Sequence, residues 1–369
     1  MEIKGEARYQ RQILLKDFGL TGQQKLFKAK VLVIGAGGLG CPVLQYLAAA
    51  GIGTLGIVDH DVVELSNLHR QILYTVADIG RSKANCAAER LQQFNPDITI
   101  IPYPQQLTNQ NAADLFNQFD LVIDGSDNFP TRYLVNDACV LLDKPLIYAA
   151  LSDAEGQVSV FNVADQDGVK VNYRDVFPEA PKPGEVLNCA EAGVLGVLPG
   201  IIGTMQAAEA IKLITGIGQP LVNQLLIYNL YTNQSYQLKL SAGANTSLPA
   251  DLDAFLKMDY NWFCGIKTQK NTTGAEVKEI SPSRFNEVKH NASYTIIDVR
   301  EKDELPVMEG FSYQHIPLSV LRQEIPLIEN QQVILFCHSG IRSIIAGELL
   351  MESYPDKEFY SLKGGILRL

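Results

Sequence analysis

The sequence predicts an α/β protein in which a doubly wound parallel sheet is followed by a second, smaller α/β domain. Residues 31–34 form an unbroken apolar run, as expected for a parallel strand covered on both faces. Short apolar runs then alternate with helical patterns up to about residue 148, which is typical of βαβ units. After a polar stretch, a buried strand that ends in charged residues is expected over residues 294–301. We therefore expect ligands at the carboxyl ends of the strands of the first sheet.

A glycine cluster directly after the first strand predicts a nucleotide site. It has the spacing G-x-G-x-x-G and consists of Gly35, Gly37, Gly38 and Gly40. Glycine allows a tight turn there and lets backbone amides approach a phosphate. Pro42 suits the first turn of a helix that continues over residues 43–50, and Gly51 suits its end. The next strand, residues 54–58, places Asp59 at its carboxyl edge, where an acid would receive a ribose hydroxyl.

The polar residues after this acid indicate which kind of nucleotide is bound. A glycine fingerprint alone would also fit a nicotinamide dehydrogenase. Here, however, one amide and two cations follow, namely Asn67, Arg70 and Lys83. Positive charge at this point suits a triphosphate, because a triphosphate carries more negative charge than a dinucleotide.

The rest of the first domain continues the alternation. Helices are expected over residues 84–94, 109–116 and 129–142, and strands over residues 98–102, 120–124 and 144–148. A β-rich return begins near residue 157, residues 171–191 form an irregular segment, residues 197–215 a strongly apolar helix, and residues 225–240 a hairpin.

Six ordered motifs carry a family resemblance over about the first two thirds of the chain. They are Arg8-Tyr9-x-Arg11-Gln12, Gly35-x-Gly37-Gly38-x-Gly40, Asp59-x-Asp61, Ser66-Asn67-Leu68-x-Arg70-Gln71, Lys83 and Asp124-Gly125-x-Asp127-Asn128. This part resembles the ubiquitin-activating-enzyme-like adenylyltransferases of the MoeB, ThiF and HesA type, which activate small ubiquitin-fold sulfur carriers in molybdopterin and thiamine biosynthesis. The resemblance implies a Rossmann-like fold of the activating-enzyme type, ATP as substrate, a carrier that ends in Gly-Gly, and a homodimer.

The resemblance also assigns roles that the residues alone leave open. Judged by charge alone, Arg11 fits a solvated surface helix; the resemblance implies that it reaches the triphosphate of the neighbouring subunit. Asp127 fits the N-cap of the helix over residues 129–142. The resemblance implies instead that Asp127 holds Mg²⁺ and that Asn128 belongs to the nucleotide site, and phosphoryl chemistry does need charge compensation.

Two cysteine positions in this part need separate expectations. Cys189 lies in the irregular segment; a lone cysteine is usually a small buried thiol, whereas the resemblance implies a cysteine that bonds covalently to the activated carrier. Many relatives also bind zinc through two Cys-x-x-Cys pairs. At those positions this chain has residues 172–175 and 261–264, in which only Cys264 is a cysteine. A tetrahedral structural site needs four good ligands, so no zinc is expected.

The last hundred residues or so form a second domain. We expect the adenylyltransferase domain to cover residues 1–265, a linker residues 266–276, and the second domain residues 277–369. In the second domain a strand over residues 333–336 leads into Cys337-His338-Ser339-Gly340-Ile341-Arg342-Ser343 and then a helix. Backbone amides and the helix dipole would stabilise a thiolate at Cys337. This domain resembles a rhodanese, a persulfide-carrying sulfurtransferase, with Cys337 and Arg342 in the catalytic loop.

The size of that loop separates sulfur from phosphate chemistry. Four residues lie between Cys337 and Arg342, whereas the related cysteine phosphatases have five and a wider cradle. We therefore expect a persulfide.

Composition excludes several classes of protein. The formal net charge of −10 argues against nucleic acid as the main partner. No apolar run is expected to reach the length of a membrane span, and the charged first residues are not expected to form a signal peptide. Six cysteines without a short paired spacing indicate reduced thiols, hence a cytoplasmic protein.

Together these features predict ATP-dependent adenylylation of the carrier's C-terminal glycine, followed by sulfur transfer from a Cys337 persulfide to form a thiocarboxylate. Two alternatives stay open at this point, a nicotinamide-dependent oxidoreductase and a non-catalytic docking protein. The carrier, its pathway (thiamine, molybdopterin, tRNA thiolation or amino-acid synthesis), the upstream sulfur donor, and the order in which Cys189 and Cys337 act are also open.

Overall fold

The computed structural model describes residues 6–180, 193–243, 248–264, 277–301, 304–321, 325–338 and 340–368. The chain divides into two compact units, Met1–Thr268 and Gln269–Leu369. The predicted linker over residues 266–276 lies outside the described residues.

The larger unit is built on one sheet of eight strands in the order β3-β2-β1-β4-β5-β6-β7-β8. The strands are β1 (Lys30–Ile34), β2 (Thr54–Val58), β3 (Thr99–Tyr103), β4 (Leu121–Asp124), β5 (Leu146–Ser152), β6 (Glu155–Phe161), β7 (Gln224–Asn229) and β8 (Gln234–Lys239). The first five in this order run parallel, and β6, β7 and β8 continue the sheet antiparallel. The predicted doubly wound fold is confirmed, with the β-rich return as an antiparallel extension of the same sheet.

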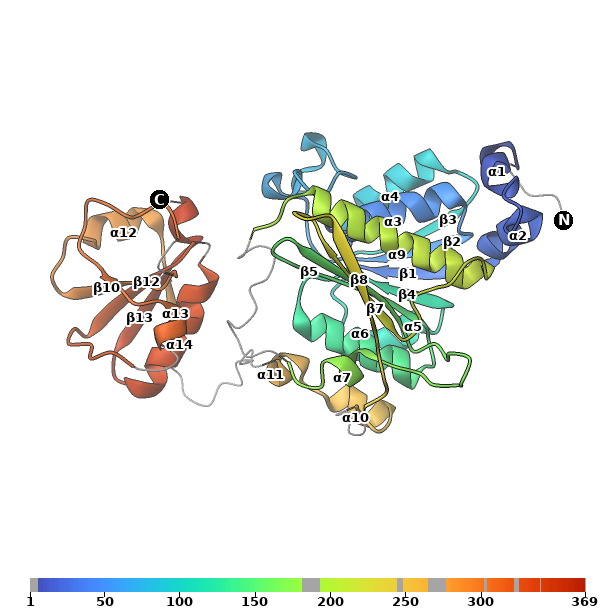
Figure 1. Cartoon of the computed structure of the whole chain (residues 1–369). Helices are drawn as coiled ribbons and strands as arrows, with labels where there is room; N and C mark the ends of the chain where they lie inside the picture. The colour runs from blue at the N-terminus through green and yellow to red at the C-terminus, as the bar shows by residue number, and fades with distance from the viewer. Residues whose placement is uncertain are drawn as a thin grey trace. The chain divides into compact units, whose positions relative to one another are not determined.

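Helices cover both faces of this sheet (Figure 1). One face carries α2 (Gly19–Lys28), α3 (Gly40–Ala50), α4 (Lys83–Phe94) and α9 (Val197–Thr215). The other face carries α5 (Asn109–Phe116), α6 (Phe129–Leu141), α7 (Tyr173–Val176), α10 (Leu252–Lys257) and α11 (Tyr260–Phe263). Each face has its own hydrophobic core, because parallel strands present apolar side chains on both sides.

The turn between β1 and α3 requires glycine at two positions. Gly35 has a φ of +86°, and a Cβ there would lie 2.8 Å from the carbonyl oxygen of Gly125. A Cβ on Gly40 would lie 2.0 Å from the carbonyl oxygen of Gly35. The backbone therefore folds back on itself tightly enough to leave its amides at the surface of the loop.

The apolar helix α9 is long and hydrophobic enough to cross a membrane by length and composition, so the expectation that no apolar run reaches this length is wrong. In the structure it packs along α3 instead. A Cβ on Gly203 would lie 2.4 Å from the carbonyl oxygen of Leu39, so the two helices are in close contact. The composition of α9 is thus explained by its place in the core.

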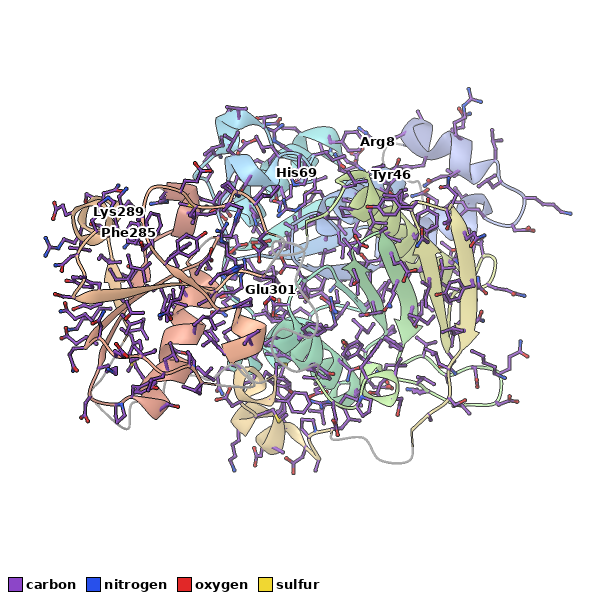
Figure 2. All side chains as sticks on the ribbon, turned by 60° about the vertical axis from the view of Figure 1, so that its left-hand side comes forward. Arg8, Tyr46, His69, Phe285, Lys289 and Glu301 are labelled. Atoms are coloured by element: carbon purple, nitrogen blue, oxygen red, sulfur yellow. The ribbon has the colours of Figure 1, made fainter. Side chains whose placement is uncertain are left out.

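The N-terminal helix α1 (Glu6–Ile13) is anchored to the rest of the larger unit through Arg8 and Tyr9. Tyr9 is buried, and its hydroxyl accepts a hydrogen bond from Asn95 Nδ2 at 2.8 Å. Arg8, labelled in Figure 2, donates to the carbonyl oxygen of Phe94 at 3.0 Å. These contacts hold α1 at the end of α4 and leave Arg11 exposed.

The smaller unit has a parallel sheet of five strands in the order β11-β10-β12-β13-β9. Its strands are β9 (Lys278–Ile280), β10 (Tyr294–Asp298), β11 (Gln314–His315), β12 (Gln332–Phe336) and β13 (Glu358–Leu362), and its α-helices are α12 (Pro282–Val288), α13 (Leu318–Leu321) and α14 (Ile341–Ser353). The smaller unit also contains the 3-10 helix η3 (Gly365–Arg368), while the 3-10 helices η1 (Leu65–Asn67) and η2 (Val76–Asp78) belong to the larger unit.

An aromatic cluster closes one side of the smaller unit. Phe285 of α12 packs edge to face on Phe311, with ring centroids 5.4 Å apart, and Lys289 lies 5.8 Å from the same ring. Figure 2 labels Phe285 and Lys289. The second domain thus has a core independent of the first, as its length predicts.

Two sequence-based boundaries need correction. The segment over residues 171–191 is not irregular throughout, because α7 forms there, with Asn172 as its N-cap. The strand that begins at Tyr294 ends at Asp298 rather than continuing to Glu301. The Asp298 carboxylate accepts the backbone amide of Arg300 at 3.1 Å and thereby turns the chain out of the sheet.

Candidate functional site

Asp59 lies against the glycine loop, as its place at the end of β2 predicts. Its Oδ2 accepts the backbone amide of Ala36 at 2.8 Å, and its Oδ1 accepts the amide of Asp61 at 2.8 Å. Burial raises the pKa of this carboxyl, and the nearby Lys83 opposes that shift. Two backbone amides therefore hold the Asp59 carboxylate in one orientation, beside the loop that would bind phosphates.

Lys83 is the first residue of α4 and is almost completely buried, with 6% of its surface exposed. Its Nζ lies 2.9 Å from Asp61 Oδ2. The structure therefore brings the two acids of the Asp59-x-Asp61 motif and the lysine together, although 22 residues separate Asp61 from Lys83.

Arg70 and Gln71 lie over the glycine loop. A Cβ on Gly38 would lie 3.6 Å from Arg70 Cδ, and a Cβ on Gly37 would lie 3.6 Å from Gln71 Nε2. Arg70 Nη1 donates to the carbonyl oxygen of Ser66 at 3.1 Å and lies 2.8 Å from His69 Nε2, a residue labelled in Figure 2. The predicted placement of Arg70 beside the loop agrees with this geometry. Gln71 was not among the predicted site residues, although it closes the same motif.

Asn67 has a local structural role in addition to any contact with phosphate. Its Oδ1 accepts the backbone amide of Glu64 at 3.3 Å and completes a capping box around η1. Its side chain is buried. Phosphate binding by Asn67 stays a prediction.

Asn128, not Asp127, caps helix α6. Asn128 Oδ1 accepts the backbone amide of Thr131 at 3.0 Å, so the alternative role of Asp127 as the N-cap is wrong. Asp127 is exposed at the carboxyl end of β4. Within the described ranges no three His, Cys, Asp or Glu side chains form a metal-binding group. One accessible carboxylate nevertheless fits Mg²⁺, because this ion usually binds one or two carboxylates together with substrate phosphates.

Buried polar atoms without hydrogen-bond partners gather at the same end of the sheet. Among the described residues they are Gln71 Oε1, Asp124 Oδ2, Ser126 Oγ, Arg132 Nε and Gln206 Oε1. Burial raises the pKa of Asp124, and Arg132, whose Nε lies 3.9 Å from Oδ2, opposes this shift. Unpaired buried polar groups are costly and often mark functional sites. Sequence analysis missed Arg132 and Gln206, because no local spacing connects α6 and α9.

The positions where relatives carry zinc-binding cysteines are filled by a buried ionic network. Arg174 is fully buried and donates to both carboxylate oxygens of Asp137, at 2.7 Å each. Its guanidinium also lies 4.4 Å from the centroid of the Phe263 ring, and the hydroxyl of Tyr260 donates to Asp137 at 2.8 Å. Arg174 thus joins the two segments in which the cysteine pairs would stand.

The side chains at these positions do not fit a zinc ion. Asn172 and Asp175 form the capping box of α7, and Asp175 Oδ1 also accepts the amide of Gly243 at 2.8 Å. Cys264 is buried, and burial raises the pKa of its thiol to about 12, far from the thiolate that zinc requires. The positive charge of Arg174 occupies this region and would oppose a cation.

Replacing Arg174 with methionine should strongly destabilise the larger unit, by about 3–5 kcal/mol, because it leaves the Asp137 carboxylate buried without its cation. Urea unfolding measures this change. Lys170→Met, which removes an exposed partner of Asp143, is the matched control and should cost less than about 1 kcal/mol.

A chelator should leave the melting temperature of the native protein unchanged, because a protein without a zinc site gains no stability from the metal by mass action. Zinc that survives dialysis, with lower stability after chelation, would show that the network does not replace the metal.

Cys337 follows β12 directly and faces the start of α14. The backbone amide of Gly340 donates to Cys337 Sγ at 3.1 Å, and Ser343 Oγ lies 3.5 Å from the sulfur. Gly340 has a φ of +95°, which lets the loop turn its amide inward. The thiol is buried. In the described part of the loop, one backbone amide thus points at the sulfur, as a loop that stabilises a thiolate or persulfide requires.

Arg342 lies in the first turn of α14 and is paired with Glu304. Its Nη2 donates to Glu304 Oε2 at 2.8 Å, and its Nη1 donates to Oε1. The sequence predicted Arg342 as a loop residue but did not indicate this partner, which is 38 residues away.

Two predicted site residues do not take part in the described site. Cys189 lies outside the described residues, so its role stays a prediction. Arg11 is exposed on α1. The structure describes a single chain, so the expected contact of Arg11 with a neighbouring subunit stays a prediction.

The fold and the two loops define an activating enzyme with a nucleotide site, joined to a domain with a reactive cysteine. The chain belongs to the ThiF family, which residues 9–250 match. It is 42% identical to the "probable adenylyltransferase/sulfurtransferase MoeZ" of Mycobacterium tuberculosis over 341 residues, which cover 91% of this chain and 86% of that protein. It is 50% identical to the "sulfur carrier protein adenylyltransferase" of Thermus thermophilus over 264 residues, 70% of this chain and 97% of that protein.

A solved structure shows the same fold for the larger unit. Escherichia coli MccB, crystallised with ATP, superposes with a TM-score of 0.54 over 67% of this chain and 76% of its own, at 24% identity. The expected relationship to MoeB-like proteins fused to a rhodanese is confirmed, because the similarity to MoeZ extends over most of the chain.

Proposed function

We propose that this protein uses ATP to adenylylate the C-terminal glycine of a ubiquitin-like sulfur carrier and then transfers sulfur to it from a persulfide on Cys337. The observation that carries this proposal is the presence of both parts in one chain. The first part is a glycine loop with Asp59, Arg70 and Lys83 beside it, and the second is a cysteine held by a loop amide. Each part supplies a step that the other lacks.

In the first step, the residues around the glycine loop bind and orient ATP. Asp59 would receive the ribose, while Lys83 and Arg70 neutralise the phosphates. Asp127 would hold Mg²⁺, which compensates phosphate charge when it is bound. The carrier's terminal carboxylate attacks the α-phosphorus, the bond to the bridging oxygen breaks, and pyrophosphate leaves with the electron pair. The product is an acyl-adenylate.

In the second step, the persulfide of Cys337 attacks the activated carbonyl carbon and AMP leaves as the phosphate anion. The resulting acyl disulfide is cleaved by a second thiol, which forms a disulfide with Cys337 and releases the thiocarboxylate. That thiol can be Cys189 or an external thiol, and a thiol reductant then restores both. In the other order, Cys189 takes the acyl group first and the persulfide displaces it.

The two alternatives from the sequence are less well supported. A nicotinamide oxidoreductase is disfavoured because similar proteins are named adenylyltransferases and sulfurtransferases. A docking protein is disfavoured because both loops keep the side chains that the chemistry needs.

The proposal is tested by pyrophosphate exchange and by mass spectrometry of candidate carriers. Radiolabelled pyrophosphate should enter ATP only in the presence of Mg²⁺ and the correct carrier. Incubation with ATP and a sulfane sulfur donor should then convert that carrier to its thiocarboxylate. If no carrier with a Gly-Gly terminus supports exchange, the proposed adenylylation is wrong.

We further propose a homodimer in which Arg11 of one subunit completes the site of the other. The support is that Arg11 is exposed on a helix outside the nucleotide fold. Arg11→Ala and Lys83→Ala proteins should each lose most of their exchange activity. A fully exchanged equimolar mixture should recover about a quarter of the native specific activity, because about half of the dimers are hybrids and one of the two sites in each hybrid regains both residues. Heterodimers that form but recover nothing would contradict the shared site.

We also propose a cytoplasmic protein. The five described cysteines are all free and buried, which suits a reducing compartment. Cell fractionation that finds the protein outside the cytoplasm would contradict this.

A further inference from the structure

Arg342, in the first turn of the helix that follows the Cys337 loop, is neutralised by a carboxylate from another segment. Arg342 lies two residues after Gly340, whose amide donates to Cys337 Sγ. Two residues span at most about 7 Å, so the arginine belongs to the surroundings of the sulfur. Both of its terminal nitrogens bond to Glu304, in the two-pronged geometry with which arginine usually binds anions.

Glu304 is itself held in place. Its Oε1 also accepts the backbone amide of Glu301 at 2.8 Å. The hydrogen bond from Arg342 lowers the pKa of Glu304, so the carboxylate is charged at neutral pH. The side chains of Arg342 and Glu304 are 11% and 29% exposed, so water screens this charge only in part.

A second arginine, Arg300, lies in the segment that carries Glu304, and it is also paired with a carboxylate. Arg300 donates to Asp298 Oδ2 at 2.6 Å and to the carbonyl oxygen of Pro306 at 2.9 Å. An anion that approaches Cys337 along this segment therefore meets arginines whose charge is already compensated by carboxylates.

We propose that Glu304 is a specificity-determining residue for loading sulfur onto Cys337. The negative charge of Glu304 neutralises Arg342, and this disfavours sulfur donors with two negative charges relative to donors with one. This inference rests on the proposed role of Cys337 and adds the class of donor that the loop admits.

The loading step is the same for both kinds of donor. The Cys337 thiolate attacks the outer sulfur of thiosulfate, a new S–S bond forms, the S–S bond of the donor breaks, and sulfite leaves with the electron pair. Methanethiosulfonate anion reacts in the same way and releases methanesulfinate. The two donors have the same scissile bond, and one carries two charges while the other carries one.

The test compares the two donors on the full-length protein, with cyanide as the sulfur acceptor. In Glu304→Gln, the ratio of kcat/KM for thiosulfate to kcat/KM for methanethiosulfonate should rise roughly five- to tenfold, as expected for one charge in partly screened surroundings. Both constants scale with the fraction of active protein, so their ratio is insensitive to partial unfolding of the variant. Glu304→Ala should shift the ratio in the same direction.

Matched variants separate the effect of this carboxylate from a general loss of charge. Glu358→Gln removes a partly exposed carboxylate that pairs with Lys278 at 2.9 Å in the same unit. Glu358 begins β13 beside Gln332, at the opposite edge of the sheet from Cys337, so the ratio should not change. In the double variant Glu304→Gln with Arg342→Gln, the ratio should return toward that of the native protein, because both charges are gone.

A ratio that stays the same or falls in Glu304→Gln would overturn the proposal. An equal rise in Glu358→Gln would also overturn it. If neither donor places sulfur on Cys337 of the native protein, as measured by mass spectrometry, the assigned role of Cys337 fails instead. The two failures are therefore distinguishable.

Discussion

Lys83→Ala should lower carrier-dependent pyrophosphate exchange by about 10²- to 10³-fold, the loss expected when one preorganised charge near a reacting phosphate is removed. Lys83 is almost completely buried, so its ammonium acts in surroundings where charge is poorly screened. The fold should tolerate the change, because the partner Asp61 is half exposed and keeps contact with water. Sulfur transfer to cyanide should stay at the native rate, since Cys337 lies in the other unit.

Lys170→Ala is the matched control for this variant. Lys170 also pairs with an aspartate, Asp143, but that residue precedes β5 and therefore lies at the opposite edge of the sheet from the glycine loop. Exchange should be unchanged. Native-like exchange in a folded Lys83→Ala protein would show that the lysine does not bind the triphosphate.

The parts of the site that lie in single loops could be predicted from the sequence. Asp59 and Cys337 each follow a buried strand directly, and the carboxyl end of a parallel strand is where ligands bind. The glycines between β1 and α3 were predictable because only glycine fits so close a backbone approach. In these cases the hydrophobic pattern of the strands and the spacing of nearby residues were enough to predict the site.

The choice between adjacent residues with the same chemistry was not predictable in this way. Asp127 and Asn128 can both cap a helix. The structure decides for Asn128, which has the extended backbone of an N-cap, with φ of −131° and ψ of 146°. Asp127 is left exposed beside the nucleotide site, where a metal can reach it.

Contacts between distant segments were also beyond the sequence. Arg174 pairs with Asp137 across 37 residues, and Gln206 of α9 donates to the carbonyl oxygen of Asp124 across 82 residues. The loss of cysteines near Arg174 was visible, but nothing local indicated that a buried ion pair stands there. The same holds for Glu304, whose carboxylate pairs with Arg342 across 38 residues.

Cys337→Ala should reduce sulfur transfer from thiosulfate or methanethiosulfonate to cyanide to the uncatalysed rate. The amide of Gly340 at the start of α14 donates to the Cys337 sulfur, whereas the Cys41 thiol, which also lies at a helix start, donates to the carbonyl oxygen of Ala36. The five described cysteines are all buried, and burial raises the pKa of the other four, Cys41, Cys86, Cys139 and Cys264, away from the reactive thiolate. Pyrophosphate exchange should be unaffected, since Cys337 has no part in forming the acyl-adenylate. Cys139 is a buried cysteine on α6, outside both loops, so Cys139→Ala should keep both activities and lose only about 1 kcal/mol of stability.

Cys189→Ala should spare transfer to cyanide and impair only delivery to the carrier. If Cys337→Ala still transfers sulfur to cyanide, the persulfide is carried elsewhere; if it loses exchange as well, the two steps are not separate in the way that the two units indicate.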